Sequence, residues 1–382
     1  MPETLTAEQE ALRNRVGEFA DRVLAPLESA LDRDREAPVP AELRKQVVQR
    51  ARAAGIHHLL QPGPDGDVGP GVIERVIAVE TLARANLRLA RYALGPEPGA
   101  LAAAAGRLRE RYLVPLLAGD KRSALAITEP RDGLSPTLGE RETGVVRISG
   151  RKSYVTGGAE ADFFVVSVTL AAKAEQPQAR ALVVIDRDAP GVRVERSFHS
   201  ADGSGHVQLA FDDVRVPDDQ LLMAPAQGGP PVGAGLNDLR LRVAARACGS
   251  AFWAIDHVTE RLRAPHREGI PLGQREGVRL RLADMGLLLY AARSALYRTA
   301  RLADHGHDVR HEVLIAKILC TENAVQVVDR AVLLAGGEAL IEGHPLERMQ
   351  RELRTLLIAE GASDVLRQSL GKGIVERGFR GF

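Results

Sequence analysis

The chain has 382 residues, which is too long for one simple hydrophobic core and predicts two or three packed units. Its 51 basic and 50 acidic residues leave a net charge of +1, which argues against nucleic-acid or membrane-surface partners. No uninterrupted apolar run reaches the roughly 18 residues of a membrane span, and the acidic N-terminus is unlike a signal peptide. We therefore expect a soluble, cytoplasmic protein.

The first 120 residues carry helical patterns throughout. Thr6 and Gln9 have the spacing of a capping box, and apolar residues then repeat at helical intervals. Further helical segments are predicted at 40–54, 72–85, 87–93, 99–109 and 110–118. The Gly/Pro-rich segment 61–71 lacks the Lys-Ser/Thr ending of a phosphate-binding loop, so it is interpreted as a plain connection.

The hydrophobic period then changes twice. Short β-branched or aromatic segments are separated by turn residues at 124–128, 145–148, 153–156, 163–170, 182–185 and 206–211. Long helical patterns follow the Gly/Pro-rich linker 227–235, at about 236–263, 275–305, 309–334 and 346–375. The predicted fold class is α+β, with an N-terminal all-helical domain (1–120), a small central β-barrel (121–226) and a C-terminal four-helix bundle (227–382).

Two groups of side chains are candidates for a disulfide or for a metal site. Cys248 and Cys320 lie in helical stretches far apart in sequence, and this placement favours buried free thiols. His305, His307 and His311 cluster near a predicted helix connection but lack a well-spaced carboxylate or thiolate ligand. We interpret them as a solvated loop and predict no metal site.

Glu360 is placed where the helical pattern breaks. It ends the apolar run 356–359 and is followed at once by Gly361, and a second amphipathic segment begins at Ser363. Glycine permits a sharp turn or a close approach by a ligand. Apolar neighbours raise the pKa of a Glu toward neutrality, as a general base requires. A helix-capping glycine after a surface Glu gives the same pattern, so both interpretations stay open on these residues alone.

Several short motifs occur in one order along the chain: Ile127-Thr-Glu-Pro130, Gly150-Arg-Lys-Ser-Tyr-Val-Thr-Gly-Gly158, Phe211-Asp-Asp-Val-Arg-Val-Pro217, Leu282-Ala-Asp-Met285, Gly336-Gly337 and Ile358-Ala-Glu-Gly361. With these motifs the chain resembles the acyl-CoA dehydrogenases over nearly its whole length. The resemblance implies FAD as cofactor and an acyl thioester substrate, carried by CoA or by a carrier protein. It also implies electron-transfer flavoprotein as the electron acceptor, and a homodimer or homotetramer, with a heteromer also open.

The resemblance gives the residues around the substrate their roles. Glu360 takes the position of the base that removes the α proton while the β hydrogen leaves as hydride to the flavin. The family's alternative position for the base holds Leu239, which cannot accept a proton. Arg240 matches an arginine near the base, and Leu134 and Gly361 take substrate-contacting positions.

The cofactor positions follow from the same resemblance. Thr128 and Thr156 match residues that touch the flavin, and Tyr154 matches an aromatic residue that stacks on its ring system. Gly336 and Gly337 match a turn whose backbone meets the cofactor of a neighbouring subunit. This last match is the reason for expecting an oligomer.

The chain departs from the family pattern at Pro265, Leu333 and Ala362, each at a position associated with holding FAD. Two alternatives therefore stay open. One is a flavin-poor paralogue that acts as a non-catalytic partner subunit or an acyl-binding protein. The other is a flavin monooxygenase or oxidase, against which the retained Glu360 argues.

Overall fold

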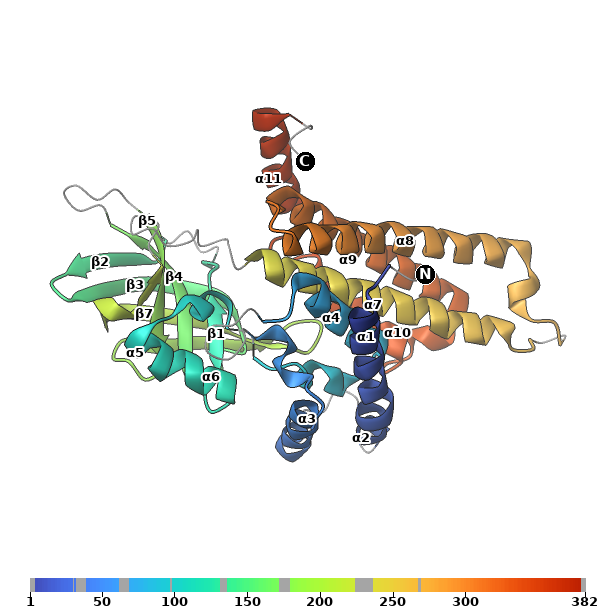
Figure 1. Cartoon of the computed structure of the whole chain (residues 1–382), viewed down its shortest axis with the longest axis horizontal. Coiled ribbons are helices and arrows are strands. Elements are labelled where there is room, and N and C mark those ends of the chain that lie inside the picture. Colours follow the sequence, from blue (N-terminus) through green and yellow to red (C-terminus); the bar gives the residue numbers. More distant parts are fainter. Residues whose placement is uncertain are drawn as a thin grey trace. The chain divides into compact units, whose positions relative to one another are not determined.

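The computed structural model describes residues 4–29, 31, 39–61, 69–96, 98–130, 136–171, 179–223, 236–266 and 269–378. The chain divides into two compact units, one from residues 1–95 together with 237–382 and the other from residues 96–236 (Figure 1). The three-domain boundaries at 120 and 226 stay a prediction. The linker 227–235 and Leu134 lie outside the described residues. Among the described helices, none is long and apolar enough to cross a membrane.

The first unit begins with helices. Helix α1 (Ala7–Phe19) continues through a π-helical turn (Ala20–Leu24) into α2 (Ala25–Ser29), and α3 (Ala41–Ala53) and α4 (Val72–Arg84) follow. The predicted capping box is confirmed, because Thr6 Oγ1 accepts from the Gln9 N–H at 3.2 Å and Gln9 Oε1 accepts from the Thr6 N–H at 3.1 Å. Short 3₁₀ turns cover His57–Leu60 and Arg88–Tyr92.

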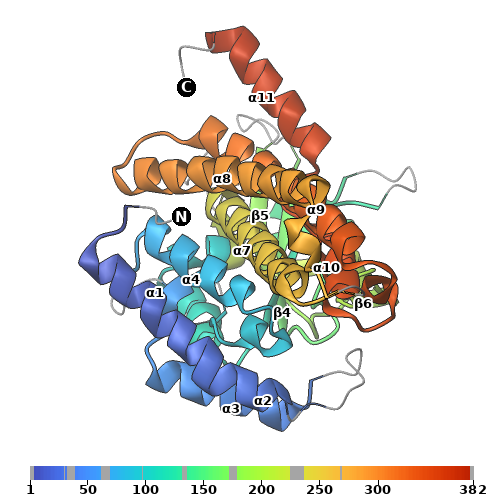
Figure 2. The same ribbon diagram turned by 90° about the vertical axis from the view of Figure 1, so that its right-hand side faces the viewer.

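The same unit ends in five helices: α7 (Leu236–Arg263), α8 (Glu276–Asp304), α9 (Arg310–Ala335), α10 (Pro345–Leu356) and α11 (Ser363–Arg377). The predicted long helices and the interruption of the last one are confirmed. Helices α7 to α10 share one apolar core with α1 and α4. Helix α11 projects from this core and packs on α9 through Leu366 against Leu314 and Ile318 (Figure 2).

The two cysteines lie inside this helical core. Cys248 on α7 and Cys320 on α9 are both buried and free, which confirms the predicted thiols. Although far apart in sequence, they are hydrogen-bonded to each other, and this contact together with burial raises the pKa of the Cys248 thiol. Cys320 Sγ also donates to the Ala292 carbonyl at 3.3 Å.

The second unit opens with short helical turns, Gly99–Ala103, α5 (Gly106–Leu108), Arg109–Leu113 and α6 (Val114–Ala118), in place of the two helices predicted there. They pack on one face of the sheet, where the ring of Tyr112 meets that of Phe163 edge-on with centroids 4.9 Å apart. This unit therefore holds helical segments that sequence reasoning assigned to the N-terminal domain.

Eight strands form one sheet: β1 (Ser123–Ala126), β2 (Leu138–Glu142), β3 (Val145–Thr156), β4 (Phe163–Leu170), β5 (Ala179–Asp186), β6 (Val192–His199), β7 (Gly205–Pro217) and β8 (Leu221–Met223). Their order is β6-β7-β3-β2-β4-β5-β8, with β1 paired to β4. The end strands β6 and β8 do not pair with each other in the described residues, so the predicted closed barrel is wrong. Closure needs paired end strands, and β8 offers a ladder of only three residues.

Candidate active site

Glu360 lies in the turn between α10 and α11, and the backbone of this turn is unusual. Glu360 has a φ of +56° and Gly361 a φ of +109°, so two successive residues leave the right-handed region. A Cβ on Gly361 would lie 2.8 Å from Leu366 Cδ2, so a larger residue does not fit without a shift. A non-glycine residue with positive φ is costly, and such strain is often found at functional sites.

One partly buried and one fully buried cation bind carbonyl groups of this turn. Arg240 on α7 donates from Nε to the Glu360 carbonyl at 3.0 Å. Lys317 on α9 donates from Nζ to the carbonyls of Leu357 at 3.0 Å and Gly361 at 2.9 Å. The sequence placed Arg240 near the base, and the structure brings it there through the backbone of Glu360. Sequence reasoning missed Lys317.

The same groups set the charge environment of the Glu360 side chain, which is half-buried. Burial raises the pKa of the Glu360 carboxyl, while the positive charges of Arg240, Arg242 and Lys317 oppose the rise. Burial has the opposite effect on a cation and lowers the pKa of the Arg240 guanidinium. A carboxyl with a raised pKa and a nearby positive field fits a general base, and it does not fit a solvated cap residue.

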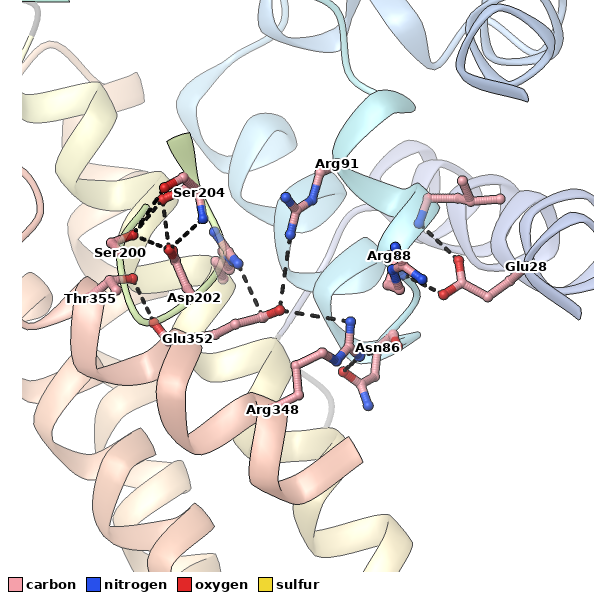
Figure 3. A network of polar contacts seen from close by, with 12 residues as sticks. Glu28, Asn86, Arg88, Arg91, Ser200, Asp202, Ser204, Arg348, Glu352 and Thr355 are labelled. Atoms are coloured by element: carbon pink, nitrogen blue, oxygen red, sulfur yellow. Dashed lines mark hydrogen bonds and ion pairs between the residues drawn. The ribbon is translucent and has the colours of Figure 1, made fainter. Parts of the chain in front are cut away.

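Helix α10, which leads into this turn, is anchored through Glu352 (Figure 3). The Glu352 carboxylate lies 3.2 Å from Arg246 on α7, 3.7 Å from Arg348 one turn earlier on α10, and 4.0 Å from Arg91. The Glu352 side chain is largely buried, so these ion pairs are less screened than exposed ones. They fix the helix from which the Glu360 turn departs.

The predicted flavin contacts Thr128, Tyr154 and Thr156 lie together at one end of the sheet. The Ser153 N–H donates to the Thr128 carbonyl at 2.9 Å, which places Thr128 beside β3. A register shift in the β3–β7 ladder between Ser153 and Val155 changes which residues face the core. Lys152 and Val155 therefore both point inward, while Tyr154 and Thr156 are exposed, Tyr154 by 64%.

Sequence reasoning missed the polar cluster behind Thr156. Thr156 Oγ1 lies 3.1 Å from His206 Nδ1, and His206 Nε2 lies 3.0 Å from the hydroxyls of both Ser200 and Ser204. The Asp202 carboxylate accepts from the Ser204 hydroxyl at 2.6 Å and from its N–H at 3.0 Å (Figure 3). Burial lowers the pKa of His206. The sequence signal for His206 was its position at the start of the predicted strand 206–211.

A buried lysine supports the Thr128 segment from below. Strands β1 and β2 both run parallel to β4 along the same edge, and the chain leaves this edge after Ala126 and returns at Leu138. Lys152 fills the gap, donating from Nζ to the Ile127 carbonyl at 2.8 Å and to the Glu129 carboxylate. Burial raises the pKa of Glu129, but the hydrogen bond from Lys152, the charge of Lys152 and backbone hydrogen bonds together outweigh it, so the pKa is lowered.

The glycine pair, Leu333 and Pro265 lie elsewhere in the helical unit, whereas Ala362 follows Gly361 in the same turn. Gly336 ends α9 with a φ of +81°, and a Cβ on Gly336 or Gly337 would meet no atom within 4 Å. Leu333 is 72% exposed, so within this chain it does not fill the surroundings of Glu360. Pro265 follows the end of α7, and Ala362 is the N-cap of α11 with no side-chain hydrogen bond. In the described ranges no three His, Cys, Asp or Glu side chains are grouped to hold a metal ion.

Comparison with known families and proteins accounts for this arrangement. Three family models match the chain: acyl-CoA dehydrogenase, N-terminal domain at residues 6–120, middle domain at 124–214 and C-terminal domain at 227–375. An acyl-CoA dehydrogenase of Bacillus subtilis is 26% identical over 379 residues, covering 96% of this chain and 98% of the relative. An acryloyl-CoA reductase (NADH) of Anaerotignum propionicum is 28% identical and covers 98% of this chain and 96% of the relative.

A solved structure of a putative acyl-CoA dehydrogenase from Mycobacterium abscessus superposes with a TM-score of 0.84 at 27% identity. The match covers 98% of this chain and 100% of that one. The family models and this superposition cover the helical N-terminal part, the sheet and the helical C-terminal part in the same order. The chain belongs to the acyl-CoA dehydrogenase family of flavoprotein oxidoreductases.

Proposed function

We propose that the chain dehydrogenates an acyl thioester between its α and β carbons, with Glu360 as the base that removes the α proton. One observation carries this assignment: the Glu360 carboxyl has a pKa raised by burial and sits on a strained turn held by Arg240 and Lys317. A base must approach its proton within hydrogen-bond reach, so a fixed turn favours the reaction. Gly361, next to Glu360 in that turn, and Leu134 are proposed as substrate contacts.

The residues at the end of the sheet fit a flavin. Tyr154 is an exposed aromatic ring that can stack on a planar ring system, and Thr128 and Thr156 are exposed beside it. The open space around Gly336 and Gly337 fits a close backbone approach, as expected where a second subunit meets the cofactor. FAD, when bound, supplies the acceptor for the β hydride.

The protein's own contribution is to hold a proton acceptor and to polarise the thioester. Removing the α proton places negative charge on the thioester oxygen, and preorganised donors must meet that charge. We assign one of these donors to the backbone N–H of Glu360, as the family resemblance implies. Arg240 fixes the next peptide unit, because it binds the Glu360 carbonyl.

The acceptor and the assembly state belong to the same proposal. We propose electron-transfer flavoprotein as the acceptor and a homodimer or homotetramer as the working form. Multi-angle light scattering of the FAD-loaded protein measures the assembly directly. A monomer that still turns over would remove the proposed role of Gly336 and Gly337.

The test uses the purified full chain incubated with FAD and then freed of excess cofactor. A visible flavin band is expected, and it should bleach under anaerobic conditions on addition of a matching acyl-CoA from a series of butyryl-, octanoyl- and palmitoyl-CoA. Glu360→Gln should keep the band and lower the bleaching rate by about 100-fold or more, because the amide accepts no proton. Glu342→Gln removes an exposed carboxylate before α10 and serves as the matched control.

Two outcomes would overturn the assignment. A chain that stays colourless after FAD incubation supports a non-catalytic partner or acyl-binding paralogue instead. Bleaching that persists in Glu360→Gln removes Glu360 as the base. Rapid oxygen uptake and peroxide formation by the reduced protein would identify an oxidase or monooxygenase.

A further inference from the structure

The turn that carries Glu360 is bound by the side chain of Lys317, to which the proposed reaction assigns no role of its own. Helix α10 ends at Leu356 and α11 begins at Ser363. The intervening residues include carbonyls that no longer have helical N–H partners, as at every helix end. Two of them, on Leu357 and Gly361, flank Glu360 on either side and point at the same atom, Lys317 Nζ.

Lys317 is fully buried on α9, within the apolar run 313–320. Its two hydrogen bonds to the turn are 3.0 Å and 2.9 Å long, and both go to backbone oxygens. The charged groups that act on it are Arg240 from α7, Glu322 from its own helix and Glu360 from the turn. Of the two carboxylates, Glu322 is engaged by Arg367 of α11 at 2.6 Å. The positive charge of Lys317 in turn acts to lower the pKa of the Glu360 carboxyl.

We propose that Lys317 is a positioning residue for the reaction of Glu360, holding both flanking carbonyls so that the carboxyl keeps one direction. This inference rests on the proposed function of Glu360. Arg240 and Lys317 bind different carbonyls of the turn. Arg240 binds the carbonyl of Glu360 itself, and Lys317 binds those of Leu357 and Gly361. Three of the turn's backbone oxygens are thus fixed from two different helices.

A second consequence is electrostatic. Burial is the largest influence on the pKa of Lys317 and lowers it, Arg240 also lowers it, and Glu322 and Glu360 raise it; the resulting pKa is about 8. A protonated Lys317 favours the carboxylate form of Glu360, whose own pKa is raised by burial. Loss of the lysine charge should therefore raise the pKa of Glu360 again. A lysine that only filled space in the core would have no such effect.

The experiment uses FAD-loaded full chain with Lys317→Met, which keeps the length of the side chain but removes its charge and donors. The matched control is Thr321→Val, a buried residue one turn later on α9 whose hydroxyl bonds only to carbonyls of its own helix. Hydrogen exchange of the peptide covering 357–363 should rise by about tenfold in Lys317→Met and stay unchanged in Thr321→Val. Unchanged exchange in a folded Lys317→Met protein would overturn the positioning role.

The charge effect is read by isotope-edited infrared spectroscopy with ¹³C-labelled glutamate. Subtracting the spectrum of the matching Glu360→Gln protein isolates the Glu360 carboxyl, and its titration should move to higher pH in Lys317→Met. If methionine prevents folding, the unmodified protein gives the answer, because the Glu360 band should respond as Lys317 loses its proton near pH 8. No response there contradicts the proposal.

Neither readout depends on turnover, so the two proposals can fail separately. If Glu360→Gln still bleaches with acyl-CoA, the proposed function fails whatever the exchange data show.

Discussion

Two lysines are fully buried among the residues that the structure describes, one in each compact unit, and they stabilise their surroundings in different ways. Lys152 fills the gap between β1 and β2, where it meets the Glu129 carboxylate, the Ile127 carbonyl and, at 3.4 Å, the Ser167 hydroxyl. Lys317 lies under the Glu360 turn and meets two carbonyls. Each supports a segment that carries predicted site residues.

The difference lies in how each positive charge is balanced. Burial lowers the pKa of Lys152, and the bonded carboxylate of Glu129 opposes this directly. For Lys317 burial lowers the pKa to about 8, and the opposing carboxylates act without a hydrogen bond to it. A buried lysine with an ion-pair partner keeps its charge and serves the fold. A buried lysine that is bound only to backbone carbonyls has a pKa close to the working pH. Of the two lysines, Lys317 is the one that acts on the proposed base, Glu360.

The largest effect is expected from breaking the ion-paired lysine. Lys152→Met leaves the partly buried Glu129 carboxylate without its bonded cation and should lower the free energy of unfolding by about 3 kcal/mol. Denaturant titration followed by circular dichroism measures this loss. Lys152→Met combined with Glu129→Leu removes both charges and should recover part of it. An equal loss in the single and double variants would mean that packing, and not the unpaired charge, dominates.

Gly361→Ala tests the Glu360 turn, which Lys317 binds. It should lower the free energy of unfolding by about 2 kcal/mol, because alanine is strained at a φ of +109° and its Cβ meets Leu366. Gly343→Ala is the matched control, since Gly343 has a φ of +80° but nothing within 4 Å of the added Cβ. Thermal unfolding of both variants separates the cost of the positive φ from the cost of the contact between the added Cβ and Leu366. Equal losses would show that the contact with Leu366 relaxes without cost.

The pH dependence of stability sharpens the comparison further. The folded pKa of Lys317 is about 8, whereas an unfolded lysine titrates near ~10.4. Between these values the unfolded chain binds more protons, so Lys317 makes the free energy of unfolding rise with pH. The stability of the unmodified protein relative to Lys317→Met should therefore increase between pH ~8 and ~10, measured by urea unfolding at several pH values. A constant difference would show that Lys317 keeps an ordinary pKa in the fold.

The sequence predicted most of the helical unit because helical periodicity is a local property. The long helices and the break at Gly361 follow from repeats of apolar residues within each segment. Strands β2 and β6 were missed because their residues are mostly polar or exposed, as in the run Gly139-Glu-Arg-Glu142. Each of these strands is held mainly by the ladder to the strand that follows it, β2 to β3 and β6 to β7, and such pairing needs no run of buried residues in the strand itself.

In the candidate site, too, the residues with a local motif were predicted and those without one were missed. Glu360, Arg240 and the exposed face of β3 were placed by motifs, but the two lysines that hold their segments were not. A signal for Lys317 was present, since it is the one charged residue in the apolar run 313–320. Its partners are backbone carbonyls 40 and 44 residues away. Backbone oxygens have no residue identity, so no motif records such a contact.

The smallest effect is expected at Ser167, which completes the surroundings of Lys152. Its hydroxyl lies 3.4 Å from Lys152 Nζ, at the weak end of hydrogen bonding, while the Ile127 carbonyl and Glu129 supply the shorter contacts. Ser167→Ala should therefore lower the free energy of unfolding by less than about 1 kcal/mol. A loss close to that of Lys152→Met would mean that the lysine depends on the hydroxyl as much as on its carboxylate. The contrast between an ion-paired and a dipole-bound lysine would then no longer hold.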